Sequence, residues 1–154
     1  MTAPEQPLGW HDLEDMRVSD VMHRGVVTCA RRTSLVTVAH LMAANGIHCI
    51  AVVETAPDRT ATLCGVVSDR DVLASVLAGD PVEDTAQACA ATEVVTVTPE
   101  DPLFRAAELM HEHGLTHVVV VETGTTTPIG VLSTLDIAAV VGRFWPAPWL
   151  AASA

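Results

Sequence analysis

The chain contains no lysine: its eight basic side chains are all arginine, against 19 acidic ones, which gives a formal net charge of −11. Binding to the phosphates of nucleic acid or of an anionic membrane surface requires clustered positive charge. The acidic balance therefore argues against nucleic acid and membranes as partners. An anionic small molecule would need a local binding device to overcome the overall repulsion.

Long apolar runs and paired cysteine motifs are also missing. The sequence has no run of about 20 apolar residues, the length that a membrane-spanning helix needs. Its first residues lack the basic start and apolar core of a signal peptide. The four cysteines form no CxxC pair and the histidines show no zinc-finger spacing. We therefore expect a cytoplasmic protein with reduced cysteines and no metal site.

Patterns typical of catalysis are absent as well. The sequence has no P-loop, no Gly-x-Ser-x-Gly and no paired-carboxylate arrangement. Cys29, Cys49 and Cys64 lie in apolar segments, where a thiol is not activated. The sequence therefore predicts no enzyme and no required cofactor. What the chain does have is apolar material, 49% of its 154 residues, which is enough for a packed core.

The second half of the sequence repeats the first. Residues 26–54 align with residues 94–122 at a shift of 68, and the shift then falls to 65 because the following loop is shorter in the second copy. We divide the chain into an N-terminal extension (1–16), a first repeat (17–80), a second repeat (81–142) and a C-terminal tail rich in proline and aromatic residues (143–154).

Each copy predicts the element order β-α-β-β-α. Thr33 and Asp101 are placed to cap the first helix of their copies, and Gly46 and Gly114 are placed to end it. The second helix of each copy starts near residues 69 and 134. The predicted strands, which are short and mostly apolar, are residues 26–29, 50–53 and 63–67, and then 94–97, 118–121 and 129–132.

One such unit cannot cover both faces of its small sheet, whereas two units packed face to face can. We therefore predict an α/β fold in which the two repeats are related by a pseudo-twofold axis. Each repeat would have a mixed three-stranded sheet and two helices. This arrangement leaves two equivalent clefts between the repeats.

A short phrase recurs just before the second helix of each copy: GVVSDRD at residues 65–71 and GVLSTLD at residues 130–136. A serine and an aspartate three residues apart at a helix start can form a capping box, which is a purely structural role. The same serine hydroxyl and the free N–H groups can also bind an anion, and the carboxylate can accept hydrogen bonds from ribose. Both interpretations remain open from the residues alone.

The doubled pattern resembles a pair of CBS (cystathionine-β-synthase) domains, known as a Bateman module. The resemblance covers about residues 17–142 and includes VSDVM (18–22), LMAANGIHCIAVVE (41–54), AAELMHEHGLTHVVVVE (106–122) and the two phrases. In that family, Gly-hydrophobic-x-Ser/Thr-x-x-Asp is the nucleotide motif. The resemblance implies that Asp71 and Asp136 hold ribose and that Ser68 and Ser133 contact phosphate. It implies that the base is lined by Val27 and Val95, with Ile47 and Leu115 nearby.

Family members that hold AMP, ADP or ATP often carry arginine or histidine at the start of the second strand. Here His48 stands there in the first copy, and Thr116 and His117 stand there in the second. Arg70 of the first phrase is matched by Leu135 in the second. The implied phosphate contact is therefore stronger in the first phrase, and S-adenosylmethionine is admissible as a less charged ligand.

The resemblance implies a regulatory module that binds AMP, ADP, ATP or S-adenosylmethionine between its repeats and signals to a regulated partner protein. It also implies a homodimer formed through the helices. Two alternatives stay open: a ligand-free interaction or scaffold dimer, in which the phrases only cap helices, and a redox- or metal-responsive module.

Overall fold

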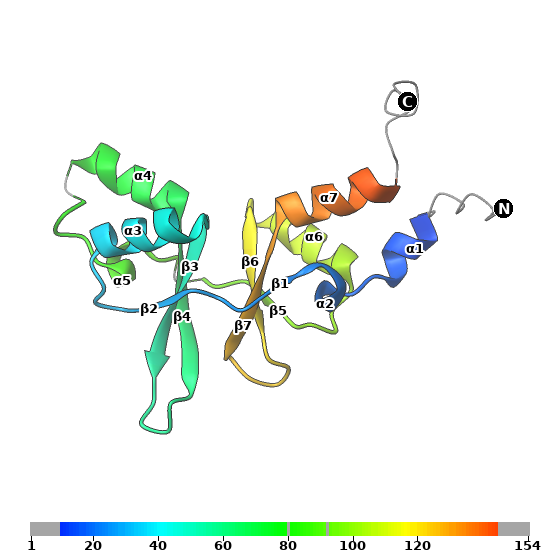
Figure 1. The fold of residues 1–154 in the computed structure, drawn as a ribbon, viewed down its shortest axis with the longest axis horizontal. Coiled ribbons are helices and arrows are strands. Elements are labelled where there is room, and N and C mark those ends of the chain that lie inside the picture. Colours follow the sequence, from blue (N-terminus) through cyan, green and yellow to red (C-terminus); the bar gives the residue numbers. More distant parts are fainter. Residues whose placement is uncertain (1–9, 80, 92, 145–154) are drawn as a thin grey trace.

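The computed structural model describes residues 10–79, 81–91 and 93–144 (Figure 1). Most of the aromatic tail lies outside these residues. The elements in chain order are α1 (Trp10–Asp15), α2 (Val18–Val21), β1 (His23–Arg24), β2 (Thr28–Ala30), α3 (Leu35–Asn45), β3 (Cys49–Thr55), β4 (Ala61–Ser68), α4 (Asp69–Ala78), α5 (Ala86–Cys89), β5 (Thr96–Val97), α6 (Leu103–Glu112), β6 (His117–Val121), β7 (Pro128–Ser133) and α7 (Thr134–Phe144).

The predicted order β-α-β-β-α is confirmed in both repeats. In the first, β2 pairs parallel with β3, and β3 pairs antiparallel with β4. In the second, β5 pairs parallel with β6, and β6 pairs antiparallel with β7. The second sheet also has a fourth strand, β1, so its order is β1-β7-β6-β5. That strand was not predicted from the sequence.

The first part of each repeat packs against the other repeat. His23 of β1 pairs with Val131 of β7, and Ala91, which lies near the start of the second repeat, forms an isolated bridge with Val66 of β4. In Figure 1 the blue segment starts beside α6 and α7, passes β7 and then crosses to β2 in the other half. The two repeats are thus joined by exchanged segments as well as by packing.

Three apolar clusters hold the molecule together. One joins α2, α6 and α7 over the second sheet, and another joins α3 and α5 to the first sheet. The third lies between the sheets and consists of buried Ala51, Val53, Val119 and Val121. Short side chains in this third cluster allow β3 and β6 to approach, which places the starts of both strands at the centre of the molecule.

The helix ends differ slightly from those predicted. Helix α3 is capped by Ser34, whose hydroxyl accepts the N–H of Thr37 at 3.2 Å, rather than by Thr33. Asp101 instead accepts the N–H of Thr98, because α6 begins only after Pro102. The helix-ending role of glycine is confirmed at Gly46 and at its counterpart in the second repeat, both with φ of 62°.

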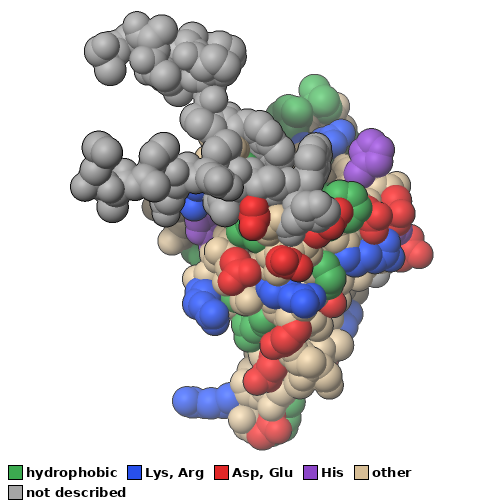
Figure 2. All heavy atoms as spheres, turned by 90° about the vertical axis from the view of Figure 1, so that its right-hand side faces the viewer, with side chains coloured by type: hydrophobic (Ala, Val, Ile, Leu, Met, Phe, Trp, Pro, Cys, Tyr) green, Lys and Arg blue, Asp and Glu red, His purple; other side chains and the backbone are tan. Residues whose placement is uncertain are grey.

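Acidic and arginine side chains intermix on the face of the molecule that Figure 2 shows, with hydrophobic side chains scattered among them. That face therefore presents no continuous basic patch for a polyanion. No helix among the described residues has the length and apolar character needed to cross a bilayer.

Candidate functional site

Each recurring phrase folds into the same hydrogen-bonded turn at the start of its second helix. Oδ2 of Asp71 accepts the backbone N–H and the hydroxyl of Ser68, both at 2.7 Å. Oδ2 of Asp136 accepts the same two groups of Ser133, again at 2.7 Å. The carboxylates therefore cap their helices, while each keeps its Oδ1 for another partner.

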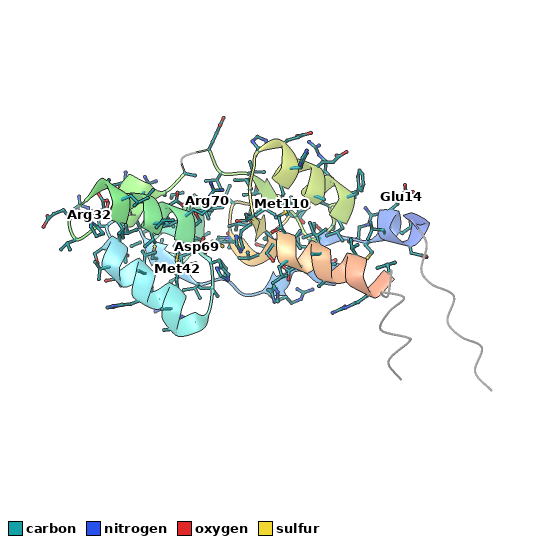
Figure 3. All side chains as sticks on the ribbon, turned by 90° about the horizontal axis from the view of Figure 1, so that it is seen from above. Glu14, Arg32, Met42, Asp69, Arg70 and Met110 are labelled. Atoms are coloured by element: carbon teal, nitrogen blue, oxygen red, sulfur yellow. The ribbon has the colours of Figure 1, made fainter. Side chains whose placement is uncertain are left out.

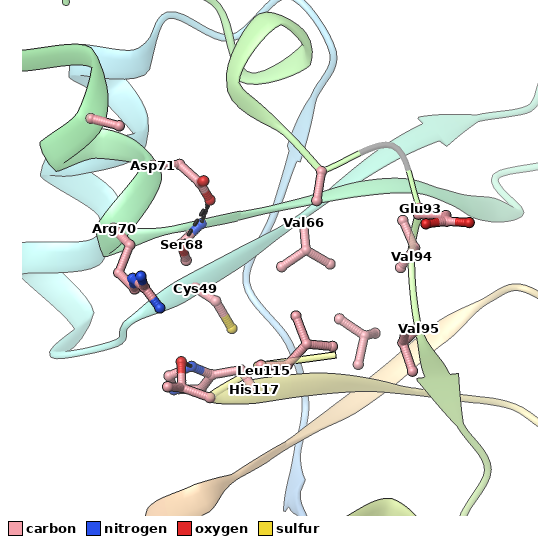
Figure 4. A pocket seen from close by; sticks show the side chains of 15 residues that line it. Cys49, Val66, Ser68, Arg70, Asp71, Glu93, Val94, Val95, Leu115 and His117 are labelled. Atoms are coloured by element: carbon pink, nitrogen blue, oxygen red, sulfur yellow. Dashed lines mark hydrogen bonds between the residues drawn. The ribbon is translucent and has the colours of Figure 1, made fainter. Parts of the chain in front are cut away.

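The first phrase lines a cleft of about 370 Å³ between the repeats, which we call the Asp71 cleft (Figure 4). Its wall from the first repeat includes Ser68, Arg70 and Asp71. The opposite wall comes from the second repeat and includes Val95 and, at the start of β6, residues 115–117. In Figure 4 the side chains of Arg70 and His117 lie at one end of the cleft and that of Val95 at the other.

The second phrase lines a cleft of about 680 Å³, which we call the Asp136 cleft. Ser133 and Asp136 come from the second repeat, and Val27, Ile47 and His48 come from the first. All twelve residues that the resemblance implied thus line one cleft or the other. Each phrase faces, across its cleft, the apolar residues of the opposite repeat that the resemblance implied as lining for a base.

The two clefts correspond almost residue for residue at the shifts of 68 and 65. Cys49 and His117, which occupy equivalent positions at the starts of β3 and β6, line both clefts. The volumes fall in the range of small-molecule sites, roughly 300–1,000 Å³. Figure 3 shows Asp69 and Arg70 near the centre of the molecule, between the helix pairs of the two halves.

The clefts differ at a few of their equivalent positions. Arg70 in one is replaced by Leu135 in the other, at the end where the phrase begins its helix. Ala91 in the Asp71 cleft is replaced by His23 in the Asp136 cleft, next to Arg24. The Asp71 cleft also contains an acidic Glu93 where the other has a glycine.

Histidines gather around the Asp136 cleft. Nδ1 of His48 lies 2.8 Å from Oδ2 of Asp69, and the His48 ring stacks on that of His117 with ring centres 5.9 Å apart. Burial lowers the pKa of His117, and the neighbouring His48 lowers it further. Nδ1 of His117 makes a 2.9 Å hydrogen bond with the hydroxyl of Thr116.

Asp136 carries one more contact than its counterpart. Nε2 of His23 lies 2.7 Å from Oδ1 of Asp136. Burial raises the pKa of Asp136, but the hydrogen bonds from Ser133 and the contact with His23 outweigh it, so that the pKa lies below its usual value. Among the described residues, Oδ1 of Asp71 has no such partner.

The four cysteines are free thiols. Burial, and to a smaller extent the charge of Asp69, raises the pKa of Cys49 to about 11. Burial also raises the pKa of Cys29 and Cys89. In the described part of the chain no group of three or more metal-ligating side chains is close enough together to hold an ion.

Sequence reasoning missed the residues that come from the first part of each repeat. His23, Arg24 and Gly25 line the Asp136 cleft, and Ala91 and Glu93 line the Asp71 cleft. The shift of 68 extends into these segments and pairs residue 23 with residue 91, so the correspondence was available in the sequence. The sequence did not show that these residues cross to the cleft lined by the phrase of the opposite repeat.

Solved structures share this fold. The chain is similar to PAE2072, a CBS domain protein of Pyrobaculum aerophilum complexed with AMP, at 31% identity and a TM-score of 0.71 over 86% of this chain and 100% of that one. It is similar to the CBS domain pair of MJ0100, in complex with 5′-methylthioadenosine and S-adenosyl-L-methionine, at 20% identity and a TM-score of 0.71 over 82% and 96%. A hexameric CBS-CP12 protein of bloom-forming cyanobacteria matches at 21% identity and a TM-score of 0.69 over 80% and 69%.

No curated protein matches the chain. The family comparison is decisive, because the CBS domain matches twice, at residues 18–78 and 82–143, and so covers most of the sequence. These two matches correspond to the two halves of the fold, each with its own sheet and pair of long helices. The chain belongs to the CBS domain family, as a tandem pair of CBS domains.

Proposed function

We propose that the protein is a regulatory sensor that binds an adenosyl ligand in the clefts between its repeats. One observation carries the proposal: a Ser–Asp turn faces apolar residues of the opposite repeat across a cleft, and this arrangement occurs twice. A capping role alone would not require the turns to face clefts. The binding of AMP by PAE2072, and of 5′-methylthioadenosine and S-adenosyl-L-methionine by MJ0100, supports the same ligand class here.

In the Asp71 cleft, Oδ1 of Asp71 accepts the ribose hydroxyls. The base lies against Val95 and Leu115, which are both partly buried. At the other end, the hydroxyl of Ser68 and the guanidinium of Arg70 contact the 5′ substituent. A carboxylate that accepts from ribose and a helix start that binds phosphate are recurring devices in nucleotide sites.

The clefts prefer different 5′ substituents. Arg70 donates a charge-assisted hydrogen bond to a phosphate in the Asp71 cleft, whereas Leu135 offers only an apolar contact in the Asp136 cleft. The Asp71 cleft is therefore the site for AMP, ADP or ATP. S-adenosylmethionine, which has no phosphate, suits the Asp136 cleft, where Ser133 and His48 supply polar groups beside those of His23 and Arg24.

Binding affects the whole module because each cleft is built from both repeats. A ligand that contacts both walls favours one arrangement of the repeats over others, in proportion to its difference in affinity for them. Coupling of this kind is typically about 1–3 kcal/mol. The favoured arrangement is the signal that a regulated partner protein reads, and the protein acts as a cytoplasmic regulator without catalytic activity of its own.

The module works as a homodimer formed through its helices. Leu73, Val76 and Leu77 lie on one face of α4 and are largely exposed, with Leu77 at 79%. Val141 on α7 is the counterpart of Val76, and it is also exposed. Contiguous exposed apolar side chains are typical of an interaction surface.

Isothermal titration calorimetry of the full chain with AMP, ADP, ATP and S-adenosylmethionine tests the proposal. We expect binding of at least one ligand, and a loss of at least about tenfold in the Asp71→Asn/Asp136→Asn double variant, because ribose loses its charged acceptors. Asparagine retains an acceptor for the helix cap, and a thermal melt of the variant establishes that it is folded at the temperature of the titration. Silence from all four ligands at millimolar concentration would favour the scaffold interpretation.

Reciprocal substitutions at one pair of positions test the assignment of ligands to clefts. Arg70→Leu gives the Asp71 cleft the residue of its counterpart, and we expect it to weaken nucleotide binding by about tenfold while leaving S-adenosylmethionine binding unchanged. Leu135→Arg should add a second nucleotide site. Equal losses for both ligand types in Arg70→Leu would contradict the assignment.

A further inference from the structure

The two ribose-binding carboxylates are not equally available. β1 brings His23 alongside β7, opposite Val131, and thereby places its Nε2 2.7 Å from Oδ1 of Asp136. The equivalent bridge in the other half joins Val66 to Ala91, which has no polar side chain. The difference between the clefts is therefore built into the segments that cross between the repeats.

A carboxylate offers about four acceptor positions. At Asp136, Ser133 uses two of them on Oδ2 and His23 uses one on Oδ1. At Asp71, Ser68 also uses two, but Oδ1 remains open among the described residues. A pair of adjacent ribose hydroxyls needs two acceptors, so ribose can bind Asp71 directly but must displace His23 to bind Asp136.

Resting on the proposed adenosyl binding, we infer that His23 competes with ribose for the Asp136 carboxylate, so that the Asp71 cleft fills first. The His23 side chain is 75% exposed, so it can swing away into solvent when ribose binds.

Other charges face the same cleft and must be separated from this effect. The titratable and charged groups around His23 and Asp136 are Arg24, His48 and His117, together with Asp69, which is paired with His48. A ligand phosphate would interact directly with these basic side chains, and that interaction would obscure the competition. Adenosine avoids it because it carries the ribose without a phosphate.

Calorimetric titration of the full chain with adenosine tests the inference. Wild-type protein should show two classes of site. His23→Ala reproduces the alanine of the other cleft, and it should strengthen the weaker site by about tenfold. Ala91→His should instead weaken the stronger site. His23→Gln retains a donor for the Asp136 carboxylate, so its weaker site should stay weak.

The outcomes separate this inference from the proposed function. Adenosine binding that His23→Ala leaves unchanged, or weakens, overturns the competition and leaves the proposed function standing. Adenosine binding by neither wild-type protein nor any variant overturns both. A thermal melt of each variant, compared with wild type, establishes that the fold is intact, and the exposure of the His23 ring favours this for His23→Ala.

Discussion

Gly130 lies directly against the carbonyl oxygen of His23, and a Cβ atom on Gly130 would come within 2.5 Å of that oxygen. At the equivalent place in the first repeat, a Cβ on Gly65 would lie 2.8 Å from the Cβ of Ala90. The glycine of each recurring phrase is thus the point at which the crossing segment contacts the sheet. Serine and aspartate recur because they form the turn, and glycine recurs because the exchanged segment occupies its side-chain space.

Alanine at either glycine should destabilise the protein. We expect Gly130→Ala and Gly65→Ala to lower the free energy of unfolding by about 1–3 kcal/mol, because the crowded neighbours must shift to accommodate the methyl group. Gly130→Ala should lower the free energy of unfolding at least as much as Gly65→Ala does, since the added methyl group would meet a backbone carbonyl oxygen. Equilibrium unfolding in urea measures both effects.

A matched control exists in α7. Gly142 lies in that helix, and apart from its chain neighbours and the helix's own backbone, no atom of the described residues lies within 4 Å of the place that an alanine methyl group would take. Gly142→Ala should therefore stabilise the protein by about 0.5–1 kcal/mol through helix propensity. Losses of similar size at all three glycines would contradict the role assigned to the crossing segments.

The thiol of Cys49 should be unreactive in the native protein. Its pKa is raised to about 11, so only about one thiol in a thousand is ionised at pH 8, and the thiolate is the reactive form. Alkylation with iodoacetamide followed by peptide mass spectrometry should therefore label Cys49 only after unfolding. Cys64, which is half-buried beside Arg31, serves as the internal control and should be labelled earlier. Equal native labelling of the two would contradict the prediction.

Asp136 should contribute to stability at neutral pH and lose that contribution in acid. Its pKa in the folded protein lies below the ordinary value because hydrogen bonds from Ser133 and the contact with His23 outweigh burial. The stabilisation is fully present above the unfolded pKa, near 3.9, and disappears as the pH falls through the lower, folded value. We expect Asp136→Asn to cost roughly 1–3 kcal/mol at pH 7 and progressively less as the pH falls below the unfolded pKa, by denaturant unfolding.

Glu112→Gln is the control for this measurement. Glu112 is exposed near the end of α6, so removal of its charge should change the free energy of unfolding by no more than about 0.5 kcal/mol at either pH. A cost of Asp136→Asn that is the same at pH 7 and pH 3 would mean that the charge of the carboxylate does not stabilise the fold.

Much of this architecture could be predicted because the sequence states it twice. The shift of 68 paired Cys49 with His117 and Gly46 with Gly114, and the structure gives each pair equivalent places. Repetition identifies which positions correspond, and the periodicity of apolar residues identifies the strands and helices. The fold class and the two clefts followed from those observations together with the family resemblance.

Repetition could not show which copy a segment packs on. β1 and Ala91 cross to the sheet of the opposite repeat. One or two residues are enough to form each of these contacts, and so short a segment has no periodic pattern of apolar residues from which the contact could be predicted. This is why His23 was not predicted as a cleft residue although its counterpart position was known. The sequence predicted Thr33 as the cap of α3, whereas the structure has Ser34. Both adjacent hydroxyl side chains can serve as caps, and only the packing of the helix decides between them.

The exposed face of α4 should decide the oligomeric state. Leu77→Arg places an unpaired charge at the centre of the proposed interface, where it would cost several kcal/mol to desolvate, so we expect the variant to be monomeric. Arginine also makes the net charge less negative, which means that dissociation could not be attributed to added repulsion between acidic subunits. Light scattering across a range of concentrations would report a mass near 16.2 kDa for the variant and twice that for wild type.

Val82→Arg is the matched control, because Val82 is 68% exposed but lies in the turn after α4 rather than on the helix face. It introduces the same charge at a side chain of comparable exposure, so the variant should remain a dimer. Both substitutions are expected to leave the free energy of unfolding of the monomer nearly unchanged. Only Leu77→Arg should lower the mass measured by light scattering, so the pair distinguishes loss of the interface from a general effect of a new surface charge. A wild-type protein that stays monomeric at all concentrations, or a dimeric Leu77→Arg variant, would contradict pairing through α4.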